Sequence, residues 1–230
     1  MRHPGFVVFF LCMLVNAGSR ADIIDPRCHR STEGTEFWFG FMEGRSSSNN
    51  HYVEITVTSR LGATFRLYIG NSSVAYNDQD FTVAANGTYQ LRVPYAEVEP
   101  RGSEQILPLG LRLVADNLVN VYALNHDNNS SDVAVIYPVE SLGTTYFAMC
   151  YTPHLYRMNN GGIDPEHGRN SEFVVVASQD GTTVTILPRA EPDGPQNKDE
   201  PFTVLLNKGE LYQVQSYVGD LTGSKITADK

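Results

Sequence analysis

The stretch EITVTSRLGATFRLYI, residues 54–69, decides the fold. Ile55 and Val57 alternate with polar residues, and after a glycine turn Phe65 and Leu67 alternate in the same way. A side-chain period of two is typical of strands that bury one face, because successive side chains of a strand point to opposite sides of the sheet. The stretch therefore predicts two half-buried strands joined by a turn.

The same rhythm returns later in the chain as EFVVVASQDGTTVTIL, residues 172–187, with the turn glycine shifted by one place. Two further pairs of segments match in the same order. FTVAANGTYQLRV resembles FTVLLNKGELYQV, and LRLVADN resembles SKITADK; these segments cover 81–93, 202–214, 111–117 and 224–230. The three pairs of segments occur in the same order, and the members of each pair are about 113 to 121 residues apart, which indicates an internal repeat.

Other short apolar runs complete a strand-rich pattern with no long helical periodicity. The pair Asn86-Gly87 predicts a tight hairpin turn between 80–85 and 88–93, since both residues tolerate positive φ. Further strands are expected at 111–114, 118–124, 133–137, 146–151, 172–177, 182–187, 202–206 and 211–216. The predicted fold is all-β, with two related antiparallel, jelly-roll-like β-sandwich repeats.

The two copies differ at their carboxyl ends. In the first, LRLVADN leads directly into an apolar strand at 118–124, whereas the second reaches Lys230 without one. We therefore expect the second repeat to be incomplete at the C-terminus, and the natural gene to continue with a similar strand. A sandwich without that strand would expose an unpaired edge.

The expected organisation begins with a secretory signal peptide at 1–21, which has a basic start, an apolar run over 6–15 and small residues suited to cleavage before Gly18 or before Asp22. The apolar run is too short to span a bilayer, and no later segment is long enough. Residues 22–158 are assigned to the first repeat with an amino-terminal lead, 159–169 to a linker or exposed binding loop, and 170–230 to the second repeat.

Net charge and cysteine content indicate which classes of partner the chain can bind and in which compartment it is found. The net charge is −9 and no basic cluster occurs, which argues against nucleic acid as a partner. Once the signal peptide is removed, Cys28 and Cys150 are the remaining thiols, in a compartment that favours oxidation. They either form a disulfide with each other or pair elsewhere. Four N-x-[ST] sequons in predicted turns mark glycosylation candidates at Asn71, Asn86, Asn128 and Asn129.

Sequence motifs for common catalytic and phosphate-binding sites are absent. Glu54 and Glu172 are the candidate carboxylate pair for glycoside chemistry. However, they occupy equivalent places in the two copies, which favours a structural role. The oxygen-rich segment 127–132 could ligate calcium, but it lacks the EF-hand pattern and is interpreted as a polar turn between strands. We therefore expect no metal, no cofactor and no catalytic residues.

Phe37, Trp38, Phe39 and Phe41 form the densest aromatic cluster of the chain. Exposed rings of this kind could stack on a sugar or anchor a protein partner. A strand that is apolar on both faces is more typical of a sandwich core, and burial is the favoured interpretation.

Several segments together resemble a known family. GTEFWFGFM (34–42), VYALNHDNNSSDVAVIYPVESLGTTY (121–146), NSEFVVVASQDGTTVTI (170–186), FTVLLNKGELYQVQS (202–216) and DLTGSKITADK (220–230) look like the amino-terminal domain of the IgGFc-binding protein family. The resemblance implies a secreted, mucus-associated or surface protein whose partners are extracellular proteins or glycoproteins, such as immunoglobulin or mucin. It supplies no catalytic residues that could be placed on this sequence.

The sequence thus predicts a secreted, non-catalytic extracellular binding or scaffold module. The alternative is a carbohydrate-binding module.

Overall fold

A computed structural model describes residues 31–44, 51–127, 130–157 and 163–230. In these residues the chain is all-β, with short 3₁₀ turns and no helix of seven or more residues, which confirms the predicted fold class. The strands are β1 (Glu33–Phe39), β2 (Tyr52–Ser59), β3 (Ala63–Ile69), β4 (Phe81–Val83), β5 (Gly87–Val93), β6 (Ile106–Leu107), β7 (Leu111–Asp127), β8 (Ser130–Ile136), β9 (Thr145–Phe147), β10 (His154–Arg157), β11 (Ile163–Arg169), β12 (Ser171–Val176), β13 (Thr182–Leu187), β14 (Phe202–Leu206), β15 (Leu211–Ser216) and β16 (Lys225–Ala228). The 3₁₀ turns are η2 (Tyr76–Asp78), η3 (Tyr95–Glu97) and η4 (Val139–Ser141).

The first sandwich is organised around the 17-residue strand β7. The first half of β7 pairs with β3 and β1, and its second half pairs with β2 and β8. β4 extends the first layer beside β3, and β5 extends the second beside β2. One continuous strand therefore belongs to both layers, where the sequence predicted two separate strands at 111–114 and 118–124.

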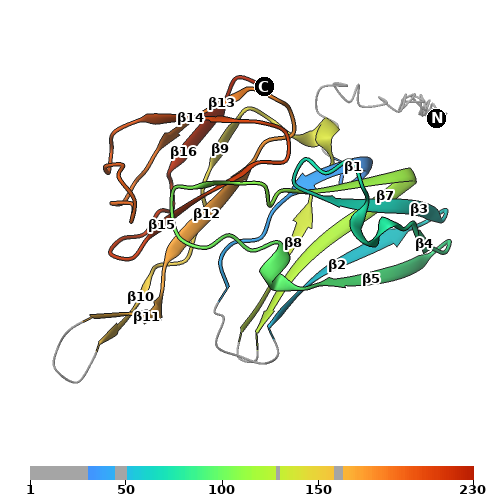
Figure 1. Cartoon of the computed structure of the whole chain (residues 1–230), viewed down its shortest axis with the longest axis horizontal. Helices are drawn as coiled ribbons and strands as arrows, with labels where there is room; N and C mark the ends of the chain where they lie inside the picture. The colour runs from blue at the N-terminus through green and yellow to red at the C-terminus, as the bar shows by residue number, and fades with distance from the viewer. Residues whose placement is uncertain (1–30, 45–50, 128–129, 158–162) are drawn as a thin grey trace, which may run out of the picture.

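The second sandwich repeats this pairing scheme (Figure 1). β13 pairs with β14 and β16 as β3 pairs with β4 and β7, and β12 pairs with β15 as β2 pairs with β5. β9 pairs with β16 as β1 pairs with the first half of β7. The internal repeat predicted from the sequence is thus a repeat of strand topology.

The ladders correct one predicted match by two residues. Phe81 lies opposite Phe65 in the first copy, and Val204 lies opposite Val184 at the corresponding place in the second. The sequence comparison had matched Phe81 with Phe202 instead. A shift of two residues leaves every side chain on its original face, and the alternating pattern therefore cannot detect it.

The ladders also add a match that the sequence comparison missed. Phe37 of GTEFWF lies opposite Leu113, and Tyr146 of GTTYFA lies opposite Ile226 at the equivalent place. Residues 145–147, which had been assigned to the first repeat, therefore supply an edge strand to the second sandwich.

Two other expectations differ from the structure. β4 and β5 flank Asn86-Gly87 but pair with β3 and β2, so the turn crosses between layers instead of closing a hairpin. Asn86 does adopt the expected positive φ, 55°. The predicted linker or loop at 159–169 is mostly strand β11, which forms a projecting hairpin with β10 (Figure 1).

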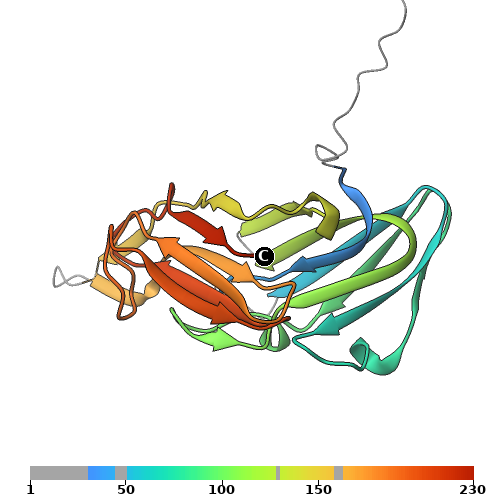
Figure 2. The same ribbon diagram turned by 90° about the horizontal axis from the view of Figure 1, so that it is seen from above.

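Each sandwich has its own core, and the two lie side by side (Figures 1 and 2). The aromatic cluster Phe37, Trp38, Phe39 and Phe41 is buried, as favoured from the sequence. Glycine permits the close approach of the two sandwiches at Gly110, where a Cβ would lie 2.7 Å from Val176 Cγ1 and 2.8 Å from the Gly209 carbonyl oxygen.

Candidate functional site

The two glutamates considered as a carboxylate pair lie on different sandwiches. Glu54 projects from β2 and accepts hydrogen bonds from Gln90 Nε2 at 2.7 Å and Arg92 Nε at 3.0 Å. Glu172 projects from β12 and accepts from Gln215 Nε2 at 2.8 Å. Their registers are equivalent, since Glu54 faces Arg92 and Glu172 faces Gln215. The structure therefore does not bring them together as an acid and base.

Glu172 instead joins a largely buried group of polar side chains between the sandwiches, with Arg101 at its exposed rim, and we call this group the polar junction. Its members are Glu43, His51, Glu99, Arg101, Glu172, Gln213 and Gln215. They come from segments spread over most of the chain, with no sequence spacing that would group them. The one available signal was glutamine at alternate positions of β15, where an apolar side chain is normally expected.

Glu99 is the most enclosed acid of the polar junction. Its carboxylate is hydrogen-bonded to His51 Nε2 at 2.7 Å, to the Gly44 amide at 3.1 Å and to Asn125 Nδ2 at 3.2 Å. The His51 ring stacks on Tyr95 with a centroid separation of 4.3 Å. Burial raises the pKa of Glu99. These contacts join the β1–β2 connection to η3 and β7 within the first sandwich.

Glu43 connects the first sandwich to the second. Its side chain accepts from the Gly102 amide at 2.8 Å, from Gln215 Nε2 at 3.1 Å and from Arg101 at 3.2 Å. Its own amide donates to Gln213 Oε1 at 2.9 Å. The hydrogen bonds of Glu43 pair polar groups of the first sandwich with polar groups of the second. Since a largely buried polar group that loses its partner is costly, these bonds hold the two β-sandwiches in one relative position.

The electrostatics of the polar junction leave Glu172 protonated at neutral pH. Burial, reinforced by the neighbouring carboxylates of Glu43 and Glu99, raises its pKa to about 8. A protonated carboxyl can remain buried beside other acids without the cost of a further charge. Nowhere in the described residues are three or more His, Cys, Asp or Glu side chains arranged to hold a metal ion. Because its hydrogen bonds join Glu43 of the first sandwich to Gln213 and Gln215 of the second, the polar junction is interpreted as a structural contact.

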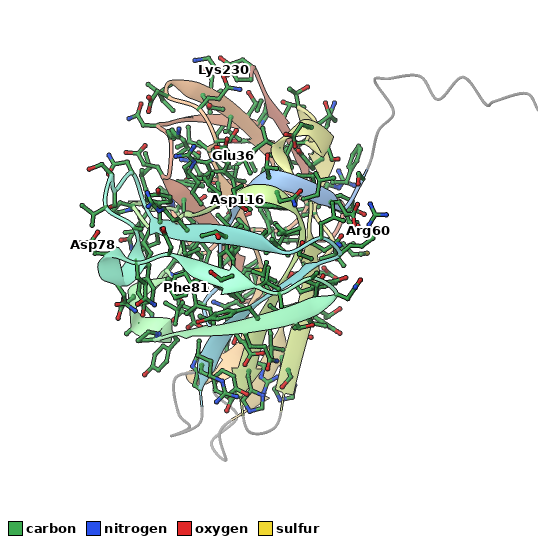
Figure 3. The ribbon with its side chains drawn as sticks, turned by 90° about the vertical axis from the view of Figure 1, so that its right-hand side faces the viewer. Glu36, Arg60, Asp78, Phe81, Asp116 and Lys230 are labelled. Carbon is green, nitrogen blue, oxygen red and sulfur yellow. The ribbon has the colours of Figure 1, made fainter. Side chains whose placement is uncertain are left out.

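The matched ADN and ADK segments also have a structural role. Asp116 Oδ1 accepts the Thr64 amide at 2.7 Å, and Asp229 Oδ1 accepts the Thr183 amide at 2.8 Å (Figure 3, where Asp116 is labelled). Each aspartate holds the start of the strand that follows a glycine turn, β3 or β13. The shallow depression lined by Gly62, Thr64, Asp116 and their neighbours surrounds the first of these turns.

A different feature has the properties of a binding surface. Apolar side chains occupy alternate, outward-facing positions of two successive edge segments, and we call this set the apolar strip: Val133, Val135, Tyr137, Phe147, Met149 and Tyr151. Phe147, Met149 and Tyr151 are 68%, 92% and 82% exposed. The chain that carries them runs along one side of the molecule, from the first sandwich to the second (Figure 2).

Such exposure is unusual for these residue types. Large apolar side chains gathered on a surface mark interaction sites more often than isolated ones do. Aromatic residues and methionine are also enriched where proteins meet. The sequence analysis had predicted strands at 133–137 and 146–151 but not the outward orientation of their apolar residues.

The remaining predicted sites are only partly described. Asn71 and Asn86 are exposed in turns, where a glycosyltransferase could reach them. Asn128 and Asn129, which separate β7 from β8 in the sequence, lie outside the described residues. Cys28 lies outside them as well. Burial raises the pKa of the Cys150 thiol to about 11. The described residues contain no helix that is long and apolar enough to cross a membrane.

Comparison with known proteins gives one match. Residues 132–230 match the family model described as IgGFc binding protein, which confirms the predicted resemblance over the carboxy-terminal part of the chain. The matched region begins in β8 and includes β9 to β16, which are all strands of the second half of the chain, but not β6, which pairs with β15. No curated protein and no solved structure matches.

Proposed function

From the match of residues 132–230 to the IgGFc binding protein family, we propose that this chain is a secreted, non-catalytic module that binds extracellular proteins through the apolar strip. The name of this family, IgGFc binding protein, refers to a binding activity. The proposal extends that activity to this chain and assigns it to a surface.

The exposure of Phe147, Met149 and Tyr151 carries the proposal. Leaving three large apolar side chains in water forgoes roughly 1.5–3 kcal/mol of burial each, which binding of a partner would recover. All six residues of the apolar strip also lie within the region that matches the family. Immunoglobulin and mucin are the partners that the family resemblance implies, in a mucus-associated or surface setting.

The direct test is a binding comparison between two triple variants. One carries Phe147→Ser, Met149→Ser and Tyr151→Ser; the control carries Leu61→Ser, Leu205→Ser and Val218→Ser, exposed apolar residues outside the apolar strip. Immobilised immunoglobulin Fc, purified mucin and a pull-down from mucosal secretions serve as probes. We expect the first variant to lose at least about tenfold in affinity and the control to bind as the parent does. Equal losses in both variants would contradict the assignment.

Carbohydrate recognition is the second candidate, because Phe147 and Tyr151 expose rings on the same face that could stack on sugars. A glycan array distinguishes the two functions. Binding to glycans, without binding to any deglycosylated protein, would favour the carbohydrate function.

A further inference from the structure

Three side chains lie in register across the face of β1, β7 and β3 that points away from the first core. Arg112 of β7 lies opposite Trp38 of β1 and opposite Tyr68 of β3. Because directly opposite residues of neighbouring strands project from the same face, the Arg112 side chain lies between two aromatic rings. Its guanidinium carbon is 5.7 Å from the centroid of each ring. Cation–π attraction to both rings therefore holds the guanidinium in place.

A carboxylate and a second cation complete this group, which we call the cation cluster: Glu36, Trp38, Tyr68, Arg112 and Lys208. Glu36 Oε1 accepts hydrogen bonds from Arg112 Nε at 2.8 Å and from Trp38 Nε1 at 3.1 Å (Figure 3, where Glu36 is labelled). Lys208 lies in the turn between β14 and β15, and its Nζ is 5.5 Å from the centroid of the Trp38 ring. The cation cluster therefore combines residues of both sandwiches.

Two positive charges share one carboxylate in the cation cluster. Although burial opposes its ionisation, the hydrogen bonds from Arg112 and Trp38 and the charge of Lys208 lower the pKa of Glu36. The carboxylate of Asp180 also lies near Lys208, but it accepts the backbone amide of that lysine, at 3.0 Å. The cluster thus carries one positive charge in excess, on a chain whose net charge is −9.

The pattern of donors and acceptors in the cation cluster defines a type of ligand. Within the described residues, the Nη nitrogens of Arg112 and the Nζ of Lys208 have no hydrogen-bond acceptor, and no donor reaches Glu36 Oε2. The side chains of Arg112 and Glu36 are 29% and 33% exposed, so a ligand can reach them. The Nη fork of a guanidinium matches two oxygens of a carboxylate or a sulfate, and Oε2 accepts a hydroxyl.

The internal repeat shows that the strand pairing does not require the cation cluster. The counterparts of Glu36, Trp38, Tyr68 and Arg112 in the second sandwich are Thr145, Phe147, Leu187 and Lys225. The same pairing scheme therefore forms there without the carboxylate, the indole or the phenol. Lys225 keeps a cation at this place and provides a matched control for charge.

We propose that the cation cluster binds an acidic sugar, with the anionic group on Arg112 and Lys208 and a neighbouring hydroxyl on Glu36. Sialic acid and sulfated hexoses share this chemistry, because each carries an anionic group close to hydroxyls. An acidic peptide fits less well, because the side chains of aspartate and glutamate carry no donor beside the carboxylate. The net charge of −9 also repels extended polyanions, which favours a ligand with a single anionic group.

Trp38 is the single tryptophan of the chain, so its fluorescence reports directly on the cation cluster. The probes are sialyllactose, sulfated lactose, neutral lactose and the peptide Gly-Glu-Gly, at constant ionic strength. We expect a saturable change with at least one acidic sugar, and at least about tenfold weaker binding of lactose and of the peptide. All proteins carry Asn71→Gln, because the Asn71 backbone lies beside Gly209, where a glycan would cover the cluster.

Three variants separate the cation cluster from general charge. Arg112→Lys keeps the charge but loses the planar fork, and Lys208→Gln removes the second cation. Each should weaken binding of the acidic sugar at least about tenfold. Lys225→Gln removes one positive charge at the equivalent place in the second sandwich and should bind as the parent does. Thermal denaturation shows that each variant is folded.

Three outcomes would overturn the proposal. The first is the lack of a saturable change with both acidic sugars, and the second is an equal loss of binding in Lys225→Gln. The third is equal binding of the peptide, which would assign the cation cluster to acidic polypeptides. The triple variant of the apolar strip should bind the acidic sugar as the parent does, so the result does not depend on the proposed function.

Discussion

The first and second sandwiches share one pairing scheme but bury their equivalent residues to different extents. In the first, β7 continues from one layer into the other, and β8 follows beside it. In the second, the described residues provide β16 in the first layer and no counterpart in the other. The comparison shows how strongly the burial of β1 and β2 in the first sandwich depends on the second half of β7.

The largest expected effect comes from truncating the same position in both copies. Phe37→Ala should reduce the free energy of unfolding by about 3–5 kcal/mol, because it leaves a cavity in a closed core. Tyr146→Ala, at the equivalent position, should cost less than about 1 kcal/mol, because that ring is half exposed. Urea denaturation of both variants measures the two values. Similar losses would mean that the second core is closed in solution.

The next effect concerns the glutamates at equivalent positions. The pKa of Glu172 is raised to about 8 in the folded chain from an ordinary value of 4.5. Its protonated form therefore contributes stability that is full below pH 4.5 and is lost as the pH rises towards 8. Glu172→Gln should leave stability at pH 5 nearly unchanged and raise it at pH 9, by on the order of 3 kcal/mol.

Thermal denaturation of both proteins across this pH range provides the measurement, with Glu54→Gln as the matched control. Glu54 is also buried, but it accepts hydrogen bonds from Gln90 and from the Arg92 guanidinium, which compensates its negative charge, so its replacement should give no gain at pH 9. If the control gained similar stability at pH 9, the gain would come from the change in net charge and not from the polar junction.

These two pairs of residues also show what the sequence could and could not predict. Alternation identified the strands and the repeat, because burial of one face forces a period of two. The same periodicity concealed the two-residue shift between β4–β5 and β14–β15, since both registers place the same faces inward. It also could not distinguish an inward Phe37 from a half-exposed Tyr146, because exposure depends on strands elsewhere in the chain.

The site was less predictable than the fold. The polar junction combines residues from Glu43 to Gln215 that approach one another only when the sandwiches pack. The sequence predicted a strand over 146–151, but β9 ends at Phe147, so Met149 and Tyr151 lie beyond it. The apolar side chains of the apolar strip also point to solvent, contrary to the usual relation between hydrophobicity and burial. The periodicity of a sequence shows which face of a strand is apolar, but it does not show whether another part of the chain packs on that face.

The smallest expected effect should be the same in both copies. Asp116→Ala and Asp229→Ala each remove the acceptor for one strand amide, that of Thr64 or Thr183. Both amides lie at exposed positions, where water can replace the lost acceptor, so each change should cost about 1 kcal/mol. Chemical denaturation gives the stability, and hydrogen exchange should show faster exchange at the affected amide alone.

Asn substitutions at the same positions provide the control, because the amide oxygen of asparagine keeps an acceptor in place. Asp116→Asn and Asp229→Asn should therefore retain most of the stability. If the alanine variant destabilised one sandwich by several kcal/mol and left the other unchanged, the matching ADN and ADK segments would not share a structural role. Equal small losses would instead show that this contact is common to both copies and does not depend on whether the adjoining core is closed.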